Sequence, residues 1–66
     1  MAIAIVALSG QTFHTGDVET VEEARQSILE DRPLKCWWFG SNGQRFAETF
    51  WFPMDRVEYI RTESDD

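Results

Sequence analysis

The first apolar run of the chain, residues 2–8, contains no polar residue. A run without polar alternation is typical of a strand that is buried on both faces. Ser9 and Gly10 then favour a turn. Residues 11–15 alternate in polarity, which predicts a second strand with Phe13 pointing inward.

The next pattern has a helical period. Thr20 and Glu23 have the spacing of a capping box, in which each side chain bonds the backbone N–H of the other residue. One apolar stripe with helical spacing follows, made of Val21, Ala24, Ile28 and Leu29. Pro33 forces the residue before it out of the helical region. The sequence therefore predicts one helix at about 21–31.

An aromatic hairpin follows the helix. Residues 37–52 hold seven of the nine aromatic residues of the chain. The turn at 40–43 ends in Asn-Gly, a strong hairpin signal between the predicted strands 34–39 and 44–52. Regular pleating puts Cys36 and Trp38 on one face, and Trp37 and Phe39 on the other. In the partner strand, Phe46, Glu48, Phe50 and Phe52 share one face, and Arg45, Ala47, Thr49 and Trp51 share the other.

A last short strand is predicted at 57–61, with Val57 and Tyr59 on one face and Glu58 and Ile60 on the other. We expect one domain over residues 1–62 and an acidic disordered tail over 63–66. The predicted order is two strands, a helix and a C-terminal meander of three strands. The fold class is α+β, with a mostly antiparallel sheet of four to five strands and the single helix packed on it.

The predicted helix is too small to cover the predicted sheet. A helix about 16 Å long and about 10 Å wide can cover roughly 160 Å² of a sheet. Four strands of about 20 Å give each face roughly 380 Å². We therefore expect self-association or a partner protein, unless the sheet curls into a small barrel. The expected partner-binding residues are Trp37, Phe39, Trp51 and Arg45, and Trp51→Ala is predicted to weaken association 10-fold or more, about 1.4 kcal/mol.

The net charge and the apolar N-terminal run limit the classes of partner to be expected. The net charge of −6 repels phosphate backbones, so no direct nucleic-acid contact is expected. Seven apolar residues are too few to span a bilayer, and no basic residue precedes them as in a signal peptide. We therefore expect no membrane contact and a cytoplasmic location. A single cysteine, which cannot form an internal disulfide, agrees with a reducing compartment.

No catalytic group stands out. His14 and Cys36 are far apart in sequence, and the apolar neighbours of Cys36 favour an inert core thiol. His14 is predicted to lie on the surface at a strand end. Glu48 is predicted to occupy an edge position or to pair with Arg45 or Lys35. One His and one Cys give no zinc spacing, so neither a metal nor a cofactor is expected, and the chain is not expected to be an enzyme.

The function predicted is a non-catalytic protein–protein interaction module. We expect a homo-oligomeric accessory or phage-type protein that binds and modulates a host protein through its aromatic sheet face. A first alternative is an acidic DNA mimic that inhibits a nucleic-acid enzyme through Glu19, Glu22, Glu23, Glu30 and Asp31. A second alternative is a small-ligand or nucleotide pocket at a subunit interface on the aromatic strands.

Overall fold

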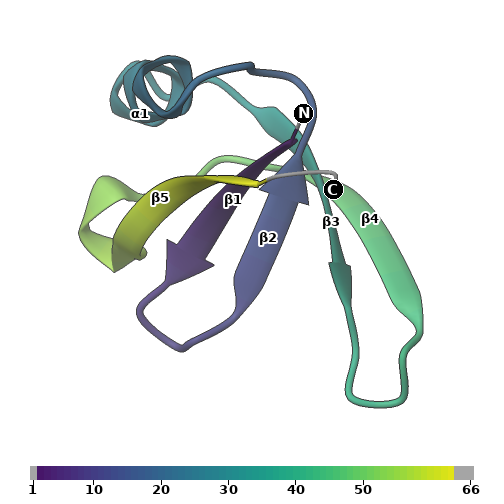
Figure 1. Ribbon diagram of the computed structural model, residues 1–66. Coiled ribbons are helices and arrows are strands. Elements are labelled where there is room, and N and C mark those ends of the chain that lie inside the picture. Colours follow the sequence, from purple (N-terminus) through teal and green to yellow (C-terminus); the bar gives the residue numbers. More distant parts are fainter. Residues whose placement is uncertain (1, 64–66) are drawn as a thin grey trace.

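The computed structural model describes residues 2–63 and shows a five-stranded antiparallel sheet with one helix (Figure 1). The strands are β1 (Ala2–Ala7), β2 (Thr12–Thr15), β3 (Leu34–Phe39), β4 (Arg45–Phe50) and β5 (Val57–Glu63). The helix α1 spans Val21–Leu29, and a 3-10 turn, η1, spans Met54–Arg56 just before β5. The predicted α+β class is confirmed.

The strand order is β4-β3-β2-β1-β5. The predicted C-terminal meander is therefore wrong, because β5 does not pair with β4 but crosses the molecule to pair with β1. The reason lies in β1, whose residues 3–6 are all buried. An apolar strand of this kind needs a neighbour on each side, and β2 and β5 supply them.

The helix begins as predicted. Oγ1 of Thr20 accepts a hydrogen bond from Glu23 N at 3.1 Å, which confirms the N-cap. The helix ends at Leu29, two residues before the predicted end, and Asp31 has a left-handed φ of 58° that stops it. Leu29 is 60% exposed, so its predicted place in the buried stripe is wrong. Ser27 takes that place and is buried beside Ile28.

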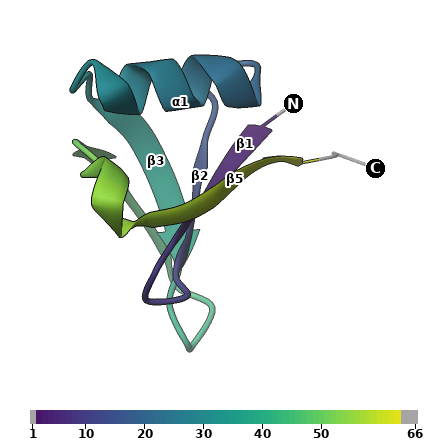
Figure 2. The same cartoon turned by 90° about the vertical axis from the view of Figure 1, so that its left-hand side faces the viewer.

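The core lies between α1 and one face of the sheet. Its buried members are Ile3, Ile5, Val18, Ala24, Ile28, Leu34 and Cys36. Figure 2 shows α1 lying across one end of the sheet, while in Figure 1 the β3–β4 hairpin extends away from the helix. The helix therefore covers only part of this face.

Rings cover the rest of the helix-side face. Phe13 of β2 makes edge contacts with Trp38, Phe50 and Phe52, at centroid distances of 5.4–5.5 Å. Phe46 stacks on Trp38 at 5.6 Å. These five rings form an aromatic cluster, so the chain itself covers much of the apolar surface that α1 does not reach.

The strand β5 differs from the sequence prediction in two ways. A register shift between Val6 and Ala7 of β1 lets both Val57 and Ile60 pack against the core, so the predicted opposition of these two residues is wrong. The strand also continues to Glu63, because Thr62 and Glu63 pair with Ile3 and Ala2. Of the predicted acidic tail, residues 64–66 lie outside the described residues.

Candidate functional site

The face of the sheet turned away from α1 is the candidate functional site, and we call it the open face. Ile3 and Ile5 of β1 point into the core, so Ala4 and Val6 and their cross-strand partners point the other way. The register extends this face across all five strands. Its members are Ala2, Ala4, Val6, Thr12, His14, Lys35, Trp37, Phe39, Arg45, Ala47, Thr49, Tyr59, Arg61 and Glu63.

A stack of flat groups runs along the open face from β2 to β4. The imidazole of His14 stacks on Trp37 with a centroid distance of 5.7 Å and an interplanar angle of 22°. The guanidinium carbon of Arg45 lies over the same indole, 5.5 Å from the ring centroid. The strands that carry His14 and Arg45 flank β3, so the indole has a planar group on each side. The rings of Phe39 and His14 form a T-shaped pair, with their centroids 6.2 Å apart.

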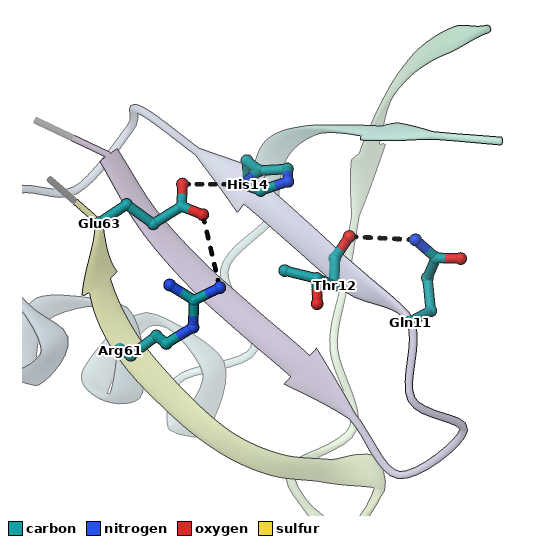
Figure 3. Close-up of polar contacts among 5 residues, drawn as sticks. All are labelled: Gln11, Thr12, His14, Arg61 and Glu63. Carbon is teal, nitrogen blue, oxygen red and sulfur yellow. Dashed lines mark hydrogen bonds and ion pairs between the residues drawn. The ribbon is translucent and has the colours of Figure 1, made fainter. Parts of the chain in front are cut away.

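A bridge of polar contacts crosses β1 on the open face and joins β5 to β2 (Figure 3). The Glu63 carboxylate lies 2.8 Å from Nδ1 of His14 and 3.8 Å from a terminal nitrogen of Arg61. The side chains of Glu63 and His14 keep only 19% and 20% of their exposure. Ala4 lies between β2 and β5 and is fully buried. The bridge thus explains why an open-face alanine has no contact with solvent.

The open face is basic although the chain is acidic. Its strand residues include Lys35, Arg45, Arg61 and the single acid Glu63, so their net charge is 3 − 1 = +2. Asp17 at the rim lowers this by one, and its carboxylate accepts a hydrogen bond from Lys35 N at 2.7 Å. The whole chain carries −6. Most acidic side chains therefore lie elsewhere.

A shallow cavity opens at the rim of this face and has a volume of about 360 Å³. It is lined by Gly16, Asp17, Lys35, Cys36, Trp37, Arg45 and Ala47. The lining combines two cations and one carboxylate with an indole. This arrangement suits a planar or anionic group of a partner.

The structure brings together three of the four predicted partner-binding residues. Trp37, Phe39 and Arg45 lie side by side on the open face, and Phe39 is 52% exposed. Trp51 follows the end of β4 and is 59% exposed. Within residues 2–63, Trp51 makes no ring contact with another aromatic side chain. It is therefore separate from the other three.

Sequence reasoning missed the role of His14. The prediction of a surface position at a strand end is wrong, because this side chain is half-buried between Trp37 and Glu63. Tyr59 and Arg61 also belong to the open face and were not predicted as site residues. The alternation of side chains along β2 and β5 was the available signal. It assigns these residues to the open face only once the pairing of β5 with β1 is known.

Cys36 and Glu48 lie where the sequence predicts. Cys36 is 1% exposed, and burial raises the pKa of its thiol to about 12, with the Asp17 carboxylate adding to the rise. A thiol of this kind is a poor nucleophile. Glu48 is exposed on β4, which is an edge strand of the sheet.

The acidic residues of the alternative site separate into two groups. Glu19, Glu22 and Glu23 lie at the start of α1, whereas Glu30 and Asp31 follow its end. The Glu30 carboxylate contacts Gln26 and Arg32, and these hydrogen bonds, that of Gln26 first, lower its pKa. Arg25 is also exposed on the helix. A continuous row of free carboxylates, as phosphate mimicry requires, is not formed by this set.

Over the described part of the chain, no three His, Cys, Asp or Glu residues are grouped so that they could hold a metal ion. None of the described helices is long and apolar enough to cross a membrane. No protein-family model, curated protein or solved structure matches the chain. The open face is therefore the feature of the molecule that bears on function.

Proposed function

We propose that this chain is a non-catalytic accessory protein that binds and modulates another protein through the open face of its sheet. The observation that supports this most directly is that face itself. Every strand except β1 contributes a ring or a cation to it. No other helix or strand among residues 2–63 lies over it.

The residue types match those of protein interfaces. Trp, Tyr and Arg are the residues most enriched among the side chains that dominate binding energy. The open face holds Trp37, Tyr59, Arg45 and Arg61. The bridge at Glu63 and the stack at Trp37 fix several of these groups before binding, which lowers the entropy lost on association.

A protein partner fits the stack better than a nucleotide does. Base recognition on a sheet uses the free faces of aromatic rings. His14 and Arg45 already occupy the two sides of Trp37. The exposed edges of this stack, together with Phe39 and Tyr59, suit side chains of a protein surface instead.

The charge of the open face defines the partner further. Two copies placed face to face would bring Lys35, Arg45 and Arg61 against the same cations, which is unfavourable. A different protein with an acidic surface would meet complementary charge. We therefore assign this face to a heterologous acidic partner.

The test is affinity capture from a lysate of the native host, with two pairs of variants. Phe39→Ala and Tyr59→Ala remove rings that are 52% and 50% exposed on the open face. Leu8→Ala and Leu29→Ala are matched controls, because these side chains are 61% and 60% exposed but belong to the turn after β1 and to α1, not to the strands of that face. We expect the controls to retain the partner that the unaltered chain retains, and the open-face variants to lose it.

A purified partner then allows titration. Phe39→Ala is expected to raise the dissociation constant 10-fold or more, about 1.4 kcal/mol. Charge reversal by Arg61→Glu should weaken binding mainly at low salt, where the Debye length is long. Equal affinity for all four alanine variants would contradict the proposal. Loss of binding in Glu22→Ala and Glu30→Ala instead would favour the DNA-mimic alternative.

A further inference from the structure

The outer edge of β4 has no neighbouring strand among the residues that the structure describes. β4 is the first strand in the order β4-β3-β2-β1-β5, and residues 45–49 are all exposed. An edge of this length presents backbone N–H and C=O groups that can pair with another strand.

The backbone groups that point outward follow from the hairpin register. Gly40 N donates to Gln44 O at 2.8 Å, which makes these two residues a hydrogen-bonded pair. Hydrogen-bonded and non-hydrogen-bonded pairs alternate along an antiparallel ladder. Phe46, Glu48 and Phe50 therefore bond to β3, whereas the N–H and C=O groups of Arg45, Ala47 and Thr49 face the free edge.

We propose that β4 pairs antiparallel with β4 of a second copy, with Ala47 on the two-fold axis. In this register Ala47 opposes Ala47 of the second copy, and Arg45 opposes Thr49 in both directions. All three outward-facing residues then form hydrogen-bonded pairs. The contact is self-complementary and closed, as a two-fold interface requires.

Side chains select this register over its neighbours. Centring the pair on Glu48 would oppose two carboxylates directly, with Cα atoms about 4.5 Å apart. Centring it on Phe46 or Thr49 would shorten the overlap of the two strands. With Ala47 at the centre, Glu48 opposes Phe46, and the smallest side chain of β4 lies where the strands cross.

The other edge of the sheet is less suited to pairing. The register of β5 shifts at its start, and the strand is strongly curved in Figure 2. It also carries Glu58, Arg61 and Glu63. Bends and charges of this kind are the usual means of blocking an edge. The free edge at β4 carries only two charged residues, Arg45 and Glu48.

Pairing at β4 is compatible with the proposed function but does not depend on it. The two sheets would form one continuous sheet of ten strands with both open faces on the same side, because directly opposed residues share a face. The register also brings the residues after β4 beside the hairpin turn of the second copy. The exposed Trp51 would then lie near Gly43 of that copy.

Disulfide trapping tests the register, since the single native thiol is buried. Ala47→Cys places two thiols on residues whose Cα atoms are about 5.5 Å apart, within the range for a disulfide. Thr49→Cys is the matched control, because its thiols would be more than about 13 Å apart. We expect mild oxidation to trap a dimer of about 15 kDa, twice 7.7 kDa, only with Ala47→Cys.

Mass in solution tests the contact itself. Light scattering at micromolar concentration should show a dimer for the unaltered chain. Ala47→Pro removes an outward-facing N–H without touching the β3–β4 ladder, and it should raise the dimer dissociation constant at least about 10-fold. A monomer at all concentrations would overturn the proposal. So would equal trapping of both cysteine variants, or trapping through Glu48→Cys in place of Ala47→Cys.

Discussion

The carboxylate of Glu63 lies 2.8 Å from Nδ1 of His14 and so joins β5 to β2 across β1, the strand between them. The two residues are separated by 49 positions in the chain. The bridge also orients the imidazole that stacks on Trp37. It therefore contributes both to the stability of the sheet and to the shape of the open face.

Removing the carboxylate should weaken the fold. Glu63→Ala is expected to lower the free energy of unfolding by about 1 kcal/mol, because a half-buried charged hydrogen bond is lost and Ala4 is uncovered. Urea denaturation followed by Trp fluorescence measures this. Arg61→Ala is the control, because its 3.8 Å contact at an exposed position should be worth less than about 0.5 kcal/mol. An equal decrease in the free energy of unfolding for the two variants would contradict a stabilising contribution of the His14 contact.

Alkaline pH should destabilise the protein through Cys36. The pKa of this thiol is raised from 9.0 to about 12 by burial first and by Asp17 second. Below pH 9 both the folded and the unfolded chain keep the proton. Between pH 9 and 12 only the unfolded chain loses it, so the free energy of unfolding falls by at most about 1.4 kcal/mol per pH unit.

The comparison that isolates this effect is Cys36→Ala, measured by urea denaturation at several pH values from 8 upward. We expect the variant to start from a lower stability, because a buried side chain is truncated, but to lose less as the pH rises. Parallel pH profiles for the two proteins would show that the thiol does not titrate differently in the folded state.

A side chain at Gly40 should destabilise the hairpin turn. A Cβ atom there would lie 3.0 Å from Cε2 of Phe46, so this ring would have to shift by a few tenths of an ångström from its stacked position on Trp38. Gly40→Ala is therefore expected to cost about 1 kcal/mol. Gly16→Ala is the control, because no atom lies within 4 Å of the added Cβ. Thermal unfolding should show a lower Tm for the first variant and an unchanged or higher Tm for the second.

Local patterns predicted the parts of the fold that depend on neighbouring residues. The helix start at Thr20 and the alternation of faces from Cys36 to Phe39 are each determined by a few neighbouring residues, and the structure has both. Where the helix lies on the sheet depends on the whole molecule instead. Helical spacing therefore could not show that Leu29 is exposed and that Ser27 is buried.

Long-range pairing was the part that the sequence did not reveal. The position of β5 beside β1 depends on the need of an apolar strand for two neighbours, and no local signal at 57–63 encodes it. The register shift at Val6 follows from that pairing and brings Val57 to the core. The grouping of Trp37 with Phe39 was predictable from pleating, whereas the contact of His14 with Glu63 required the strand order.

The pairing of β5 with β1 has a consequence for folding during synthesis. In chain order β1 is the first of the five strands, yet it lies inside the sheet between β2 and β5, and β5 is the last of the five to be made. The helix and the hairpin can form early because their contacts are local. Closure of the sheet instead joins distant segments, the kind of contact that slows folding. Until residues 57–63 arrive, one edge of β1 stays bare, so the nascent chain is most prone to aggregate in that interval.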